Sequence, residues 1–226
     1  MTKVSKKNRN DIYIKWQVSN DINFEKIIAS GSHKSSFSDN FTVKVDAKIP
    51  QEFNGKKVYY RFNYENIYSD IGTTSTLPSD NPNKYNIAFC SCSNYPAGFF
   101  NAYKEIANND DIDLVLHLGD YIYEYGRNVY PSTGSEEMGR VVEPPHEIIS
   151  LDDYRKRYAL YRSDEDLQNL HASKPMIVVW DDHEFTNNTW KNGAQNHSDN
   201  EGKFEDRIYN AIKSYYEWMP IRENKN

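Results

Sequence analysis

Short apolar segments alternate with helical patterns from Tyr85 onward, and this alternation restricts the fold more than any other feature of the sequence. The apolar segments are YNIAFCSC, LVLHLGD and MIVVWDD, at 85–92, 114–120 and 176–182. Helical patterns lie between and after them, at 99–109, 154–162, 167–172 and 203–219. Apolar strands separated by helices are typical of a mostly parallel sheet covered by helices, so we expect an α/β domain.

The first part of the chain has a different pattern. The segments IYIKWQV, FTVKVDAKI and KVYYRFNYEN are rich in β-branched and aromatic residues, and turn residues separate them. This pattern predicts an antiparallel β-sandwich over 1–80, although the roughly five visible strands are fewer than the seven of a complete immunoglobulin-type sandwich. Pro, Asn, Asp and Ser between Leu77 and Asn83 predict a linker, so the α/β domain is expected at 84–226.

Composition excludes several classes of function. The chain has 226 residues and a formal net charge of −6, which disfavours non-specific nucleic-acid binding because that needs a basic surface. No apolar run reaches the ~18 residues of a membrane-spanning helix, and the basic N-terminus lacks the apolar core of a secretory signal. An anionic substrate therefore needs a local positive charge, such as bound metal.

The two cysteines, Cys90 and Cys92, are expected to be unpaired. Residues i and i+2 of a strand have Cα atoms roughly 6.6 Å apart, whereas a disulfide needs Cβ atoms about 3.8 Å apart. Cys90 is expected to be buried as a small apolar residue. For Cys92, at the end of its strand, a structural role and a ligand role are equally compatible with the pattern.

Each apolar strand ends in side chains able to bind metal. The first ends at Cys92, the second at Asp120 and the third in the segment from Asp181 to Glu184. Sites in open parallel sheets form beyond the carboxyl ends of the strands, so we expect these groups to converge. Each motif alone has a structural alternative, since GD is a common turn or cap and DDHE can cap a helix from Thr186. The coincidence of three such strand ends favours a site.

This donor set suits phosphate ester hydrolysis. Carboxylates bind hard cations, while thiolate and phenolate suit iron or zinc. Two metals about 3.5–4 Å apart can clamp the attacking and leaving oxygens and activate a hydroxide nucleophile. His183 is placed to stabilise or protonate the departing oxygen, because histidine titrates near neutrality.

At these residues the sequence resembles the PhoD-like (alkaline phosphatase D) family of metallophosphoesterases. The stretches that carry the resemblance are IAFCSCSNYPAGFFNAYKEIA, DLVLHLGDYIYEYG, PHEIISLDDYRKRYALYRSDEDLQNLHASKP, IVVWDDHEFTNN and YYEWMPIR. They cover nearly all of 85–222, apart from a stretch after Asn188. The preceding β-rich segment resembles that family's N-terminal immunoglobulin-like domain.

The resemblance implies an alkaline phosphatase-like hydrolase of phosphate mono- or diesters, with Ca²⁺ and Fe³⁺ in its site. It places Cys92, Asp120 and Tyr123 on the family's cysteine, GD aspartate and following tyrosine. The Asp-x-x-Tyr spacing also resembles that of purple acid phosphatases, where the aspartate bridges two metals and the tyrosine binds ferric iron. Asp182 takes the place of the asparagine in the superfamily's GNHE motif and becomes a ligand of the second metal. His183 takes the place of the motif's histidine.

Two further expectations follow from where the resemblance stops. Metallophosphoesterases supply more ligands from a C-terminal half, so this chain resembles the middle of a longer enzyme, with a partial β-domain and a truncated catalytic domain. The alternatives are a split gene, in which a separate chain supplies the missing half, a degraded and catalytically incompetent remnant of such an enzyme, or a piece taken from a longer chain. A β-sandwich binding module is the less favoured alternative. The family is typically exported, and because no signal is visible the localisation stays open.

Overall fold

The computed structural model describes residues 1–6, 8–78, 81 and 84–222. The chain divides into two compact units. One unit contains Met1–Ile87 with two short later segments, Asp110–Leu114 and His171–Pro175, and the other contains the rest of the described chain. Most of the predicted linker at 77–83 falls outside the described residues, so its structure stays a prediction.

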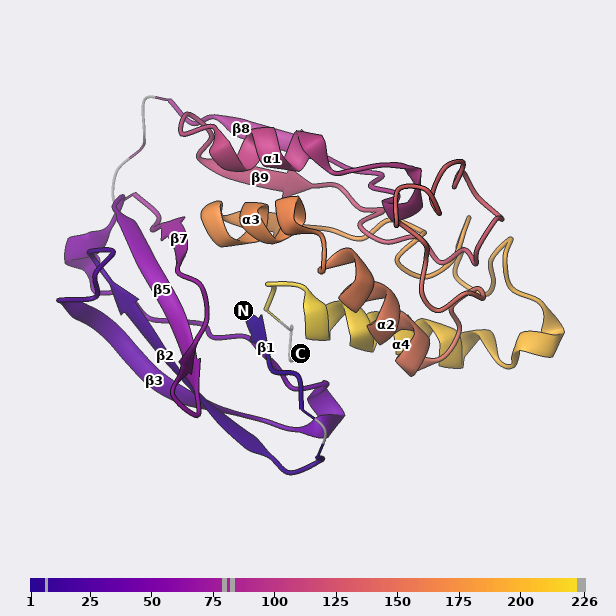
Figure 1. Ribbon diagram of the computed structural model, residues 1–226, viewed down its shortest axis with the longest axis horizontal. Helices are drawn as coiled ribbons and strands as arrows, with labels where there is room; N and C mark the ends of the chain where they lie inside the picture. The colour runs from indigo at the N-terminus through magenta and orange to yellow at the C-terminus, as the bar shows by residue number, and fades with distance from the viewer. Residues whose placement is uncertain (7, 79–80, 82–83, 223–226) are drawn as a thin grey trace. The chain divides into compact units, whose positions relative to one another are not determined.

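The first unit is an antiparallel β-structure (Figure 1). Its strands are β1 (Thr2–Lys3), β2 (Ile12–Ser19), β3 (Ile27–Ser35), β4 (Thr42–Val43), β5 (Lys57–Tyr64), β6 (Ile67–Tyr68) and β7 (Gly72–Ser75), with single 3₁₀ turns η1 (Phe37–Asp39) and η2 (Gln51–Phe53). Strand β2 pairs with β3 and β5, and β5 also pairs with β6 and β7. Strands β1 and β4 form a separate two-stranded ladder.

The core of the β-rich unit lies under alternate residues of β2. Ile12 and Ile14 are buried together with Phe41, Val43 and Phe62. The predicted strand at 41–49 is only partly correct, because strand structure in that segment is limited to Thr42–Val43. Strand β4 pairs with β1 through these two residues only, so the ladder between the two strands ends at Val43. The apolar alternation in the sequence continues beyond that point.

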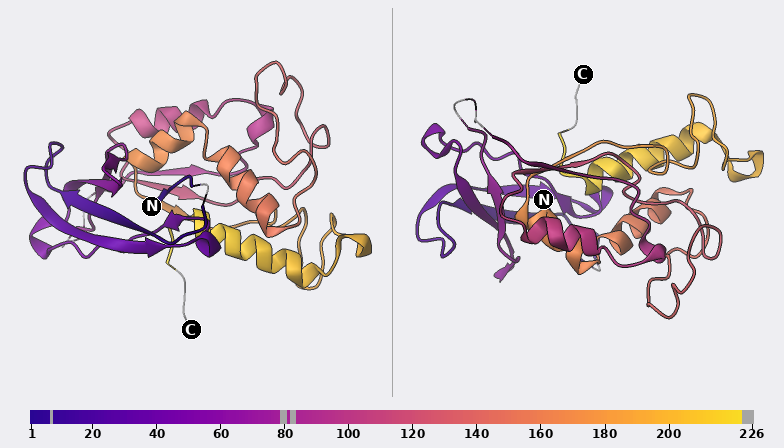
Figure 2. Two further views of the ribbon diagram at one scale, coloured as in Figure 1. Left: turned by 60° about the horizontal axis from the view of Figure 1, so that its bottom comes forward. Right: turned by 90° about the horizontal axis from the view of Figure 1, so that it is seen from above.

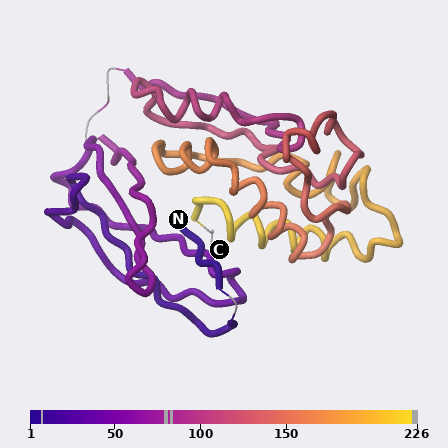
Figure 3. The backbone as a smooth tube through the Cα atoms, in the orientation of Figure 1, coloured from indigo at the N-terminus to yellow at the C-terminus, as the bar shows by residue number. Residues whose placement is uncertain are grey.

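The second unit contains the predicted alternation of strands and helices (Figures 1 and 3). Its elements are β8 (Ile87–Cys90), η3 (Tyr95–Ala97), α1 (Asn101–Asn108), β9 (Leu114–His117), α2 (Leu151–Tyr161), α3 (Glu165–Ser173), β10 (Met176–Val178), η4 (Asp199–Glu201) and α4 (Phe204–Trp218). Strand β9 is central, with β8 on one side and β10, parallel to β9, on the other.

Among the residues that the structure describes in this unit, one face of the sheet is covered and the other is largely exposed. Val115 and His117 are 0% and 1% exposed, and Tyr103 of α1 contacts His117 through a hydrogen bond of 2.8 Å between its hydroxyl and Nε2. Helix α1 lies along this face (Figure 2). On the opposite face, Phe89, Leu118, Ile177 and Val179 are 49–63% exposed. Within the described part of this unit, the predicted cover of helices is therefore present on one face only, because an apolar strand pattern does not record what packs on each side.

Candidate metal centre

The loops that follow the three strands are joined to one another. The backbone N–H of Cys92 donates to Gly119 O at 3.2 Å, and that of Ser93 donates to Asp120 O at 3.0 Å. Gly119 has φ +102°, and a Cβ there would lie 2.5 Å from the backbone nitrogen of Asp181. Glycine is thus required for the loops after β9 and β10 to approach so closely.

Two predicted site residues have strained backbones. Cys92 and Asp120 have φ values of 57° and 51°, in the left-handed region that non-glycine residues seldom adopt. Such a conformation persists only where the surrounding contacts impose it, and it is frequent at functional sites. Each residue lies just after its strand, at the position predicted from the strand-end pattern.

Three of the predicted residues form a cluster able to hold a metal ion. One ligand atom from each of Asp120, Asp182 and His183 lies within 4.8 Å of the others. Asp120 Oδ1 is buried and has no hydrogen-bond partner among the described residues, whereas Oδ2 accepts from the hydroxyl of Tyr123 at 3.3 Å. A buried carboxylate oxygen without a partner is unfavourable, so this geometry fits a bound cation.

The remaining predicted residues lie beside this cluster. The Cys92 side chain is exposed, and its thiol next to Asp120 favours the ionised form of that carboxyl, which lowers its pKa. Burial outweighs this effect and raises the pKa of Asp120, and the nearby charges of Asp181 and Asp182 act in the same direction. Burial and the neighbouring Asp120 also raise the pKa of Tyr123. A cation would offset this crowding of acidic groups and favour their ionised forms.

Glu184 is a residue of the site that the sequence reasoning did not single out. Its side chain is 1% exposed and accepts backbone N–H bonds from Asp120 at 3.0 Å, Tyr121 at 2.6 Å and Asp181 at 2.8 Å. Burial raises its pKa to about 7. Glu184 therefore joins the ends of β9 and β10, a role that its place in DDHE does not reveal.

Glu124 positions His183. This glutamate is 0% exposed, and its Oε2 lies 2.7 Å from His183 Nδ1. Its Oε1 accepts from the backbone N–H of Asn187 at 2.7 Å and from Asn196 Nδ2 at 3.2 Å. Burial lowers the pKa of His183, but the hydrogen bond and charge of Glu124, together with the charges of Asp120 and Asp182, outweigh burial, so the net shift is upward.

A buried arginine holds the chain that follows Asp120. Arg157 of α2 is 0% exposed and donates to the carbonyl oxygens of Tyr123, Glu143 and Pro144. Glu143 and Pro144 are consecutive residues, whereas Tyr123 lies much earlier in the chain. Helix α2 therefore fixes the backbone of Tyr123, although α2 contributes no residue to the predicted site.

Aromatic rings line one side of the cluster. The ring of His183 lies 4.3 Å from that of Tyr123 and 5.4 Å from that of Tyr125, measured between centroids. Tyr130 stacks on both tyrosines, at 5.5 Å and 12° on Tyr123 and at 4.9 Å and 18° on Tyr125. Tyr130 is 42% exposed, so this ring group reaches the surface.

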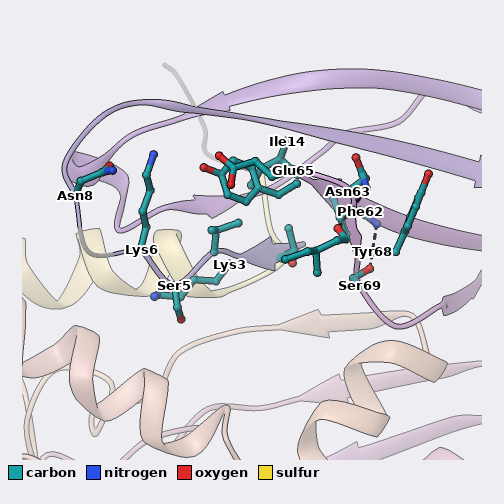
Figure 4. A pocket seen from close by; sticks show the side chains of 14 residues that line it. Lys3, Ser5, Lys6, Asn8, Ile14, Phe62, Asn63, Glu65, Tyr68 and Ser69 are labelled. Carbon is teal, nitrogen blue, oxygen red and sulfur yellow. Dashed lines mark hydrogen bonds between the residues drawn. The ribbon is translucent and has the colours of Figure 1, made fainter.

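A cavity in the β-rich unit contains none of the predicted site residues. It has a volume of about 600 Å³ and lies between residues 2–6, Asn8 and the hairpin of β5 and β6 (Figure 4). Lys3, Lys6, Phe62 and Tyr68 are among its lining side chains.

None of the described helices combines the length and apolar composition needed to span a bilayer.

Comparison with known proteins identifies relatives of this chain. The chain is 41% identical over 214 residues to alkaline phosphatase D of Bacillus subtilis (strain 168), which covers 92% of this chain and 35% of that protein. A solved structure of PhoD is 39% identical, with a TM-score of 0.86 over 96% of this chain and 40% of that chain. The chain thus spans little more than a third of the length of these relatives.

The structural match confirms the metallophosphoesterase-like α/β part of the predicted fold. The immunoglobulin-like description of the first unit is not confirmed by it. Residues 1–78 match the PhoD-like phosphatase N-terminal domain, and residues 87–226 match the PhoD-like phosphatase family. The chain therefore belongs to the PhoD-like phosphatase family.

Proposed function

We propose that the chain is part of an alkaline phosphatase-like hydrolase that cleaves phosphate mono- or diesters at a two-metal site. The observation that carries this proposal is the approach of Asp120, Asp182 and His183 to within 4.8 Å, with a buried Asp120 oxygen that has no described partner. The curated relative is named as an alkaline phosphatase, and its activity is extended to this chain by inference.

The donor atoms suggest how two metals divide the site. Asp120 has one free buried oxygen and one in contact with Tyr123, so we assign it as the ligand shared by both metals. Cys92 and Tyr123 would complete the side that suits a transition metal, because thiolate and phenolate donors suit iron or zinc. Asp182 would bind the second metal, and Asp181 is a weaker candidate for this role. The assignment of Fe³⁺ and Ca²⁺ rests on the family resemblance.

The metals would supply Lewis acidity for the phosphoryl oxygens and a lowered pKa for water. The protein's own contribution is to orient the donors and the proton source. Glu124 holds His183 through Nδ1 at 2.7 Å, which leaves Nε2 to hydrogen-bond or protonate the departing oxygen. Hydrogen bonds to Glu184 and from Arg157 hold the backbone of Asp120 and Tyr123 in place.

The direct test is metal-dependent release of nitrophenol from mono- and bis(nitrophenyl) phosphate by the purified chain. Asp120→Asn and Asp182→Asn should each lower kcat/KM by at least about 100-fold, because metal ions supply several kcal/mol of transition-state stabilisation. Asp152→Asn is the matched control, since that aspartate is 73% exposed in a surface ion pair with Lys156. Activity that persists in both site variants would contradict the proposal.

One observation favours the second candidate, a catalytically incompetent remnant. The open face of the sheet exposes Phe89 and Ile177 by 63% and 57%, and apolar patches of this kind promote association. A chain that melts without cooperativity and binds metal weakly would support this candidate, whereas a cooperative transition with tight stoichiometric binding would exclude it. The comparisons give no support to a separate chain that supplies a C-terminal half.

A further inference from the structure

The ring of Tyr130 is the outermost member of the aromatic group beside the metal cluster. It stacks nearly parallel to Tyr123 and Tyr125, with interplanar angles of 12° and 18°. Both inner tyrosines are less exposed than Tyr130, which is 42% exposed. Stacked neighbours hold the orientation of the outer ring, so its exposed surface is available to a further planar group.

The Tyr130 ring lies near His183, on the side of the site from which the leaving group would depart in the proposed reaction. Tyr130 and Tyr125 lie 6.4 Å and 5.4 Å from His183, between ring centroids. In the proposed function, His183 serves the departing oxygen. A group attached to that oxygen would therefore lie next to these tyrosines, while the metal site would hold the phosphoryl group.

We propose that Tyr130, supported by Tyr125, forms a subsite for a planar aromatic group on the alcohol side of the ester. The substrate class is then phosphate esters of aromatic alcohols, in preference to alkyl esters of equal charge. This inference rests on the proposed function for the placement of the phosphoryl group. The stacked tyrosines themselves are independent of any metal.

The experiment measures binding of phenylphosphonate and propylphosphonate, which carry the same charged group and are not hydrolysed as esters. The full chain should bind phenylphosphonate more tightly by about 2- to 12-fold, the range expected for one aromatic pair. Tyr130→Leu should abolish that ratio, and Tyr130→Phe should retain it because the ring is kept. Tyr209→Leu is the control, since Tyr209 is a 63% exposed tyrosine on α4.

The outcomes separate the two proposals. Equal binding of both phosphonates, or a ratio that Tyr130→Leu leaves unchanged, overturns the aromatic subsite while the phosphoryl site stands. If neither phosphonate binds, the proposed function fails. The subsite is then tested with phenol alone, by measuring magnetisation transfer from the protein to phenol in NMR. Transfer that is lost in Tyr130→Leu and retained in Tyr209→Leu supports the subsite, and transfer that is equal in both variants overturns it.

Discussion

The two faces of the β8–β9–β10 sheet have similar apolar strands but different surroundings. On the face that contacts α1, Val115 and His117 are almost fully buried. The strand ends beyond them are joined through Glu184, whose carboxylate accepts hydrogen bonds from the backbone N–H groups of both. On the other face, Phe89, Ile177 and Val179 are more than half exposed. From this difference we expect the stability of the sheet to depend on its buried face and on the strand-end contacts of Glu184, and much less on the exposed face.

The largest expected effect is at Glu184, which joins the ends of two strands. Glu184→Leu would leave three backbone N–H groups without their acceptor, so we expect a loss of about 3 kcal/mol or more in the free energy of unfolding. Urea denaturation followed by circular dichroism measures this loss. Glu184→Gln keeps the shape and one acceptor oxygen and should lose less. Equal stability of Glu184→Leu and the wild type would show that the covered side does not support the sheet.

His117 should make the covered face sensitive to acid. Burial lowers its pKa to about 4, whereas an unfolded chain protonates histidine near pH 6.5. The unfolded state therefore binds more protons between these values, and the free energy of unfolding should fall by about 3 kcal/mol as the pH drops from about 6.5 to about 4. Above pH 6.5 this contribution is constant.

The variant His117→Gln isolates this dependence. Glutamine can still hydrogen-bond the Tyr103 hydroxyl that His117 Nε2 contacts, but it does not titrate. Acidic groups titrate in both proteins, so the difference between the two stability curves reports His117. Parallel curves across this pH range would contradict the prediction.

A pair of substitutions compares the two faces most simply. Val115→Ala on the covered face should cost about 1 to 3 kcal/mol, because it removes fully buried methyl groups and leaves a cavity. Phe89→Ser on the open face should change stability by no more than about 0.5 kcal/mol and should reduce association at high concentration. Thermal denaturation and light scattering measure the two effects. A larger cost for Phe89→Ser would show that the open face is packed in solution.

Much of this organisation was predictable from local sequence patterns. Apolar periodicity located β8, β9 and α4 to within a few residues, because strand and helix periods depend on the chain itself. The strand-end rule predicted that Asp120 and Asp182 lie together, since it depends only on parallel order.

The supporting residues were not predictable in the same way. The roles of Glu124, Glu184 and Arg157 depend on hydrogen bonds to residues distant in the sequence, and a charged residue in isolation is most simply read as exposed. The open sheet face was missed for a related reason. Apolar residues predict burial, but the packing partner is a property of the tertiary structure.

The most direct test of the central claim is the metal content of the purified chain, measured by elemental analysis after gel filtration. The account predicts about two metal ions per chain. Asp120→Asn should lose both, because Asp120 is assigned as the shared ligand, and Asp182→Asn should lose one, while Asp152→Asn keeps both. A wild-type chain without stoichiometric metal, or an Asp120→Asn variant with its full content, would contradict the account.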